Sequence, residues 1–112
     1  MSGEADFPEF ITALPEADIP VEGVRAKLLQ GKDQQVIFMV FERDVEVPQH
    51  AHEAQWGVVL DGEIDITIGG VTRTCRKGDS YFIPKDVQHG ARIRRGYKDI
   101  TVFNQQDRYK EK

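Results

Sequence analysis

The chain has 112 residues, a formal net charge of −4 and a hydrophobic fraction of 39%. This length suits one domain with one hydrophobic core. The basic residues are scattered, which argues against nucleic-acid binding, and no apolar run is long enough to predict a membrane span. The acidic N-terminus lacks the apolar core of a signal peptide. Because Cys75 is the single cysteine, no internal disulfide can form, and we expect a cytoplasmic protein.

Residues 1–23 are predicted to form an irregular N-terminal arm. The segment is acidic and carries three prolines, which deny backbone hydrogen bonds to a sheet. Phe10, Ile11 and Leu14 nevertheless favour burial. The arm is therefore expected either to pack on a neighbouring subunit or to be a loosely ordered tail.

Residues 24–112 are predicted to form a single domain of short strands. The segment "QVIFMVFE" is rich in β-branched and aromatic residues. The other predicted strands lie in "VRAKLLQ", "WGVVLDGEIDITIGGVTRTC", "KGDSYFIPKD", "QHGARIRRG" and "KDITVFNQ". Asp61-Gly62 and Gly69-Gly70 are typical hairpin turns, and the polar C-terminal "DRYKEK" is compatible with a short helical turn. Many short strands with frequent turns predict an antiparallel β-sandwich or barrel.

The chain contains three histidines, His50, His52 and His89. Residues two apart on a strand share a face, so His50 and His52 can direct their rings to one point. His89 has the same parity as Ala91 and Ile93, which predicts an inward side chain. A divalent metal would satisfy all three rings, although surface exposure or ordinary hydrogen bonding would also explain a His-x-His pair.

The segment "HAHEAQWGVVLDG" resembles the first motif of the cupin superfamily, and "GDSYFIPKDVQHG" resembles the second. Gln55 stands where the first motif has a glutamate, and His89 occupies the histidine position of the second. The spacing between His52 and Gln55 is shorter than in the motif, which makes Glu53 a rival ligand. Regular strand alternation points Glu53 away from His52 and favours Gln55, whereas a bulge would reverse this.

The resemblance implies a small jelly-roll β-barrel that holds one divalent metal ion, with His50, His52, Gln55 and His89 as ligands. Zinc, nickel, manganese and iron are all candidates. The resemblance also implies a homodimer, often with N-terminal segments packed across the interface. A neutral glutamine leaves the +2 charge of the ion uncompensated, which favours Lewis-acid chemistry on anionic ligands over a ferric or higher-valent state.

Some small cupins that linearise unsaturated uronates also use three histidines and a glutamine, together with an Asp, a Phe and an Arg near the C-terminus. The segment "DITVFNQQDRY" is similar in composition. It offers Asp99 as a general acid or base and Arg108 as a carboxylate-binding group. Surface ion pairing is the alternative role for each.

The predicted function is that of a metal-binding cupin that isomerises or tautomerises a small polar or anionic substrate, either a sugar acid or another carboxylate. Two alternatives stay open. One is a non-catalytic cupin that binds or senses a small ligand in the same pocket. The other is an iron- or manganese-dependent dioxygenase.

Overall fold

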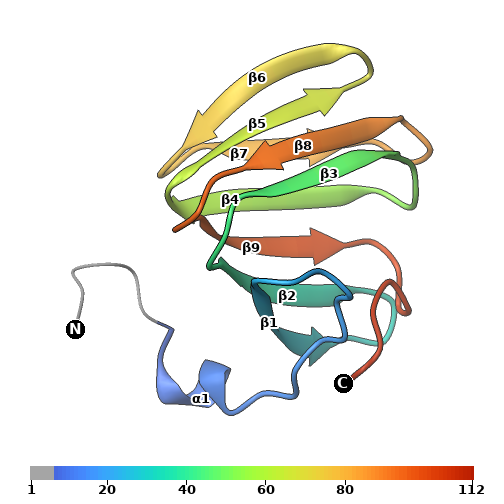
Figure 1. Ribbon diagram of the computed structural model, residues 1–112. Helices are drawn as coiled ribbons and strands as arrows, with labels where there is room; N and C mark the ends of the chain where they lie inside the picture. The colour runs from blue at the N-terminus through green and yellow to red at the C-terminus, as the bar shows by residue number, and fades with distance from the viewer. Residues whose placement is uncertain (1–6) are drawn as a thin grey trace.

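The computed structural model describes residues 7–112, which form two antiparallel β-sheets that face each other (Figure 1). The five-stranded sheet has the order β1-β2-β9-β4-β7, and its strands are Val24–Gln30, Gln35–Phe41, Lys98–Phe103, Gln55–Asp61 and Ser80–Ile83. The four-stranded sheet has the order β3-β8-β5-β6, and its strands are Val45–His50, His89–Ile93, Glu63–Ile68 and Val71–Arg76. The predicted all-β jelly roll is confirmed, although the two sheets do not join into one closed ring of hydrogen bonds.

The core lies between the sheets because each strand directs alternate side chains inward. Ile64 and Ile66 of β5 are buried, whereas Asp65 between them is only partly buried. Ile37 of β2 and Phe103 of β9 meet them from the opposite sheet, at exposures of 0% and 2%. Burying a side chain of this size contributes about 1.5–3 kcal/mol, so this interior accounts for much of the stability of the fold.

The two predicted hairpin turns have different outcomes. Gly69 and Gly70, with φ of 57° and 84°, join β5 to its hydrogen-bonded partner β6, as expected. The hairpin at Asp61-Gly62 is wrong, because β4 and β5 belong to different sheets. At Gly62 the chain instead crosses from one sheet to the other. Only glycine fits at this crossing, because a Cβ on residue 62 would lie 2.7 Å from the Cα of Tyr97.

Residues 15–18 are hydrogen-bonded both to β1 and to the C-terminal residues. Pro15 accepts a hydrogen bond from the Leu28 amide at 2.8 Å, and the Asp18 amide donates to the Lys110 carbonyl at 2.8 Å. The predicted C-terminal helical turn is therefore wrong, since an isolated bridge pairs Glu111 with Ala17 instead.

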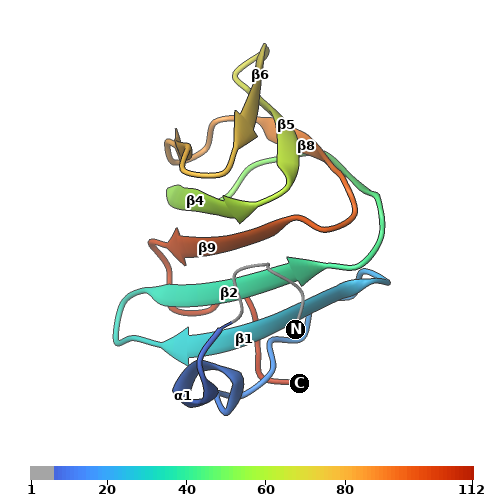
Figure 2. The ribbon, with the colours of Figure 1, turned by 90° about the vertical axis from the view of Figure 1, so that its left-hand side faces the viewer.

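The N-terminal arm is less irregular than expected. It contains one short helix, α1, over Glu9–Thr12, which lies beside β1 at the end of the molecule opposite β6 (Figure 2). Phe10 on this helix is 77% exposed, and residues 1–6 of the predicted arm lie outside the described residues. Among residues 7–112, no helix has the length and apolar character needed to span a membrane.

Candidate metal centre and its cavity

A bulge in β3 brings His50 to the inner face. Val45 and Val47 line the cavity between the sheets, and on a regular strand His50 would then face outward. The register of β3 against β8 shifts between Val47 and His50. Because Pro48 in this segment has no backbone N–H, it cannot continue the ladder. The shift reverses the parity and places His50 opposite His89.

His52 lies in the loop between β3 and β4, not on a strand as expected. The conformation of this loop, and not strand alternation alone, therefore brings the His50 and His52 rings close together. The ring centroids of His50 and His52 are 5.0 Å apart, those of His50 and His89 are 4.3 Å apart, and those of His52 and His89 are 4.6 Å apart. Each ring offers a nitrogen within 4.8 Å of the other two, so the three predicted ligands do converge.

Backbone carbonyls fix the orientation of all three rings. Nδ1 of His50 lies 3.0 Å from the Pro48 carbonyl, Nδ1 of His52 lies 2.7 Å from that of Glu53, and Nδ1 of His89 lies 2.9 Å from that of Val87. A carbonyl can only accept, so each Nδ1 carries the proton. Each Nε2 then presents a lone pair, which is the arrangement that ligating histidines use.

The environment keeps two of these rings neutral. Burial lowers the pKa of His52 to about 4, and the Arg108 guanidinium adds to this effect against the opposing Glu53 carbonyl. Burial also lowers the pKa of His89. A neutral imidazole is the form that binds a metal.

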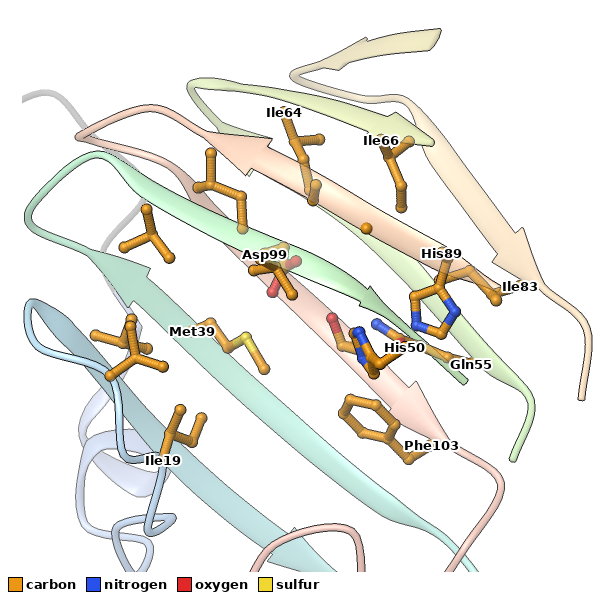
Figure 3. Close-up of a pocket in the computed structure, with 18 of the residues that line it drawn as sticks. Ile19, Met39, His50, Gln55, Ile64, Ile66, Ile83, His89, Asp99 and Phe103 are labelled. Atoms are coloured by element: carbon orange, nitrogen blue, oxygen red, sulfur yellow. The ribbon is translucent and has the colours of Figure 1, made fainter. Parts of the chain in front are cut away.

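Gln55, the first residue of β4, lines the cavity beside the histidines. Figure 3 shows its side chain at the same end of the cavity as His50 and His89. Glu53 does not line the cavity, and its carboxylate forms an ion pair with Lys85 at 3.5 Å. Trp56 is 42% exposed and faces away from the cavity, as alternation on β4 requires.

The cavity has a volume of about 280 Å³, close to the lower limit for small-molecule sites. Its histidine end also contains Phe103, whose ring centroid is 5.5 Å from that of His52 (Figure 3). Most of the remaining wall is apolar. It is formed by Ile19, Pro20, Val21, Val24, Met39, Phe41, Val45, Val47, Ile64, Ile66, Ile83, Ala91 and Ile93.

Asp99 is an acidic side chain on this wall and is only 2% exposed. Tyr97 donates a hydrogen bond to Oδ2 at 2.8 Å, and Tyr81 donates to the same oxygen at 3.2 Å. Burial raises the pKa of Asp99 to about 6, although these hydrogen bonds oppose the shift. Thr101 lies close enough to lower this pKa as well, yet within residues 7–112 neither its hydroxyl nor Oδ1 of Asp99 has a hydrogen bond of ordinary geometry.

Arg108 reaches the cavity from the C-terminal segment. Its guanidinium carbon lies 4.5 Å from the ring centroid of Tyr109 and 5.7 Å from that of Phe103. Its buried Nε has no hydrogen-bond partner within the described part of the chain. Surface ion pairing, the alternative role for Asp99 and Arg108, is wrong for the buried Asp99. For Arg108, the described residues show ring stacking and no ion pair.

The sequence interpretation missed the two tyrosines that hold Asp99. A signal was present, because Asp99 shares parity with Thr101 and Phe103 along β9, and Tyr97, directly before the strand, has the same parity. An acidic residue in the inward register of a strand requires buried partners. Gly57 is part of the same arrangement, since a Cβ there would lie 2.5 Å from the Tyr81 hydroxyl oxygen.

Comparisons with known proteins agree with this architecture. A family model described as a cupin domain matches residues 36–102, more than half of the chain. A Bacillus subtilis protein named H2HPP isomerase is 34% identical over 104 residues, which cover 91% of this chain and 44% of the relative. The chain thus spans less than half the length of that curated relative.

Two solved structures have the same fold. An RmlC-like cupin from Shewanella frigidimarina has 28% identity and a TM-score of 0.73, over 84% of this chain and 86% of that one. KdgF from a Halomonas species has 22% identity and a TM-score of 0.69, over 81% of this chain and 87% of that one. With the family model, these structures and the histidine cluster in agreement, the chain belongs to the cupin family.

Proposed function

We propose that this cupin binds one divalent metal ion per chain through His50, His52 and His89, with Gln55 as the fourth ligand. The observation that carries the proposal is the 3.1 Å distance between Nε2 of His52 and Nε2 of His89. Both Nδ1 atoms donate to carbonyls, so two lone pairs face each other. Two facing lone pairs repel each other unless a cation lies between them. The distance also fits a metal site, because two neighbouring ligand atoms that are each about 2.1 Å from one ion lie about 3 Å apart.

Gln55 is preferred to Glu53 because Gln55 lines the cavity and Glu53 pairs with Lys85. Three neutral imidazoles and a neutral amide leave the full +2 charge on zinc, nickel, manganese or iron. Arg108 adds a further positive charge near the rings, as its effect on the pKa of His52 indicates. This end of the cavity therefore favours an anionic group.

We further propose that the protein is an isomerase or tautomerase of a small anionic substrate, with either a sugar-acid or another carboxylate skeleton. A bound divalent ion supplies Lewis acidity that polarises a carbonyl or carboxylate. Arg108, which lines the cavity, binds and orients the anionic group through its guanidinium. Asp99 Oδ1 accepts a proton from one substrate atom and returns it to another, while Tyr81 and Tyr97 hold Oδ2 in place. The name of the Bacillus subtilis relative, an isomerase, supports this reaction class.

The apolar character of most of the cavity wall also fits the alternative of a non-catalytic cupin that binds a small ligand. The buried acid Asp99 supports the enzyme, because binding a ligand alone needs no protonatable group at this position. The dioxygenase alternative stays a prediction, which oxygen uptake by the iron-loaded protein tests.

Elemental analysis of protein purified without added metal tests the site. Wild-type protein is expected to carry about one metal ion per chain and to lose stability in a chelator, as a ligand that binds only the folded state requires. His50→Ala should lose the metal, and Gln55→Ala should weaken metal binding about tenfold or more. Glu53→Ala is the matched control and should retain it. Equal metal content in His50→Ala and Glu53→Ala would refute the site.

Members of this family often oligomerise, and we propose that this chain forms a homodimer through the outer face of its five-stranded sheet. Leu29, Trp56 and Phe82 are 47%, 42% and 58% exposed there and line one apolar groove. A second copy would bring the assembly to the size of the curated relative, of which one chain covers 44%. The packing of the N-terminal arm on a partner and the cytoplasmic location stay predictions.

A further inference from the structure

We propose that the ligand of this cavity is a carboxylic acid with an elongated apolar body, not a polyhydroxylated sugar acid. The carboxylate occupies the histidine end and the apolar body occupies the far end. The position of the carboxylate rests on the proposed metal site, whereas the position of the body rests on the cavity wall alone.

The cavity extends along the strands. His89, Ala91 and Ile93 of β8 all line it. His89 and Ile93 are four residues apart, which is about 13 Å of strand at about 3.3 Å per residue. Ile93 pairs with Val45 of β3 and with Ile64 of β5, so these three side chains form one row across the four-stranded sheet at the far end. A ligand that fills the cavity must therefore be longer than it is wide.

The far end contains only hydrocarbon side chains among the lining residues. Val24 and Phe41 from the five-stranded sheet face the row of Val45, Ile64 and Ile93. A buried hydroxyl at this end would find no side-chain donor or acceptor among Val24, Phe41, Val45, Ile64 and Ile93, which line it, and an unpaired buried polar group weakens binding strongly.

The polar side chains of the cavity wall lie elsewhere. Besides the histidines and Gln55, they belong to Tyr81, Asp99, Thr101, Arg108 and Tyr109. Arg108 stacks on Phe103 at the histidine end, and Thr101 and Asp99 follow Phe103 inward along β9. The wall thus changes from the cationic Arg108, through the hydroxyls of Thr101 and Tyr81 and the acid Asp99, to apolar. Figure 3 shows Asp99 between the histidines and the apolar end. This order matches a carboxylate, at most one or two adjacent polar atoms, and an apolar body.

A binding comparison by calorimetry tests this order with three probes. Metal-loaded protein should bind 3-phenylpropanoate at least 100-fold more tightly than D-galacturonate, since the sugar acid leaves several hydroxyls unpaired. Acetate, which is a carboxylate without a body, should bind weakly. The same measurements on chelator-treated protein should show weaker binding of both phenylpropanoate and acetate, and phenylpropanoate should keep its advantage over acetate.

Variants locate the body. Val45→Phe fills the far end and should weaken phenylpropanoate binding at least tenfold, while acetate binding and metal content stay unchanged. Val24→Phe fills the far end from the opposite sheet and should weaken phenylpropanoate binding to the same extent. It replaces Val45→Phe in the test if that variant does not fold. Val71→Phe is the control, because Val71 is 71% exposed on β6.

The outcomes separate the two proposals. If galacturonate binds as tightly as phenylpropanoate, or if both filling variants bind phenylpropanoate normally, the inference is wrong even when the metal is present. If the protein holds no metal, yet phenylpropanoate exceeds acetate and the filling variants remove that advantage, the proposed metal function is wrong and the inference on the apolar body stands.

Discussion

The neutral variant Asp99→Asn should make the protein more stable at neutral pH. Asp99 is 2% exposed, and an asparagine oxygen can accept the same hydrogen bonds from Tyr81 and Tyr97. Its amide group can donate to the Thr101 hydroxyl, which has no partner of ordinary geometry among residues 7–112. The substitution therefore removes a buried charge without removing a contact.

The magnitude and its pH range follow from the pKa of Asp99, which burial raises from 3.8 to about 6. Between these values, the folded state holds a proton that the unfolded state has released. Stability contributed by this group is thus present in full below about pH 4 and is lost as pH rises through about 6. A pKa raised by about two corresponds to about 3 kcal/mol at 1.36 kcal/mol per unit. That is a large fraction of the 5–15 kcal/mol typical of a domain.

Urea unfolding in a chelator, at pH values from 4 to 8, measures the effect without metal binding. Wild-type protein and Asp99→Asn should be equally stable near pH 4, and the variant should exceed wild type by up to about 3 kcal/mol at pH 7.5. Asp33→Asn, in the exposed turn between β1 and β2, is the control and should show no such divergence. A difference that is constant across pH, or a variant less stable than wild type at pH 7.5, would refute the reasoning.

Two further predictions concern other parts of the fold. Gly57→Ala should destabilise the protein by about 1–3 kcal/mol in urea unfolding, because the added Cβ would lie 2.5 Å from the Tyr81 hydroxyl oxygen; a neutral effect would show that the ring is free to move. Trp56→Lys should shift the protein from dimer to monomer in sedimentation experiments, whereas Val71→Lys, on the edge strand β6, should leave the dimer intact. A wild-type monomer at micromolar concentration would contradict the proposed interface.

The strands were predictable from the sequence. The sheet to which each strand belongs was only partly predictable. Alternation along "EIDITI" predicts the buried face of β5. The turn at Asp61-Gly62 is compatible with a hairpin, and nothing local distinguishes this from a crossing between sheets. Whether the chain forms a hairpin or crosses between the sheets depends on the close approach of Gly62 to Tyr97, and these two residues are distant in the sequence.

The candidate site was likewise predictable only in part. The histidines were predictable as a group, but the reason for their convergence was not, because it needs the β3 bulge and a loop. The choice between Gln55 and Glu53 was left to strand alternation, which does not apply in a loop. The structure instead places the Glu53 carboxylate beside Lys85, a residue 32 positions further along the chain.

The separation of Asp99 from the histidines would let one cavity hold both the proposed metal ion and a protonatable acid. A +2 ion beside a carboxylate lowers its pKa strongly and turns it into a ligand. Asp99 is four residues from Phe103, which contacts His52, and Thr101 lies between them on β9. Burial raises the pKa of Asp99 to about 6, and an ion held by the histidines would lower this pKa less than an ion in contact with the carboxylate would. A substrate that contacts both the proposed metal site and Asp99 must then present its exchangeable proton several bonds away from its metal-bound group, which is the arrangement that an elongated carboxylic acid provides.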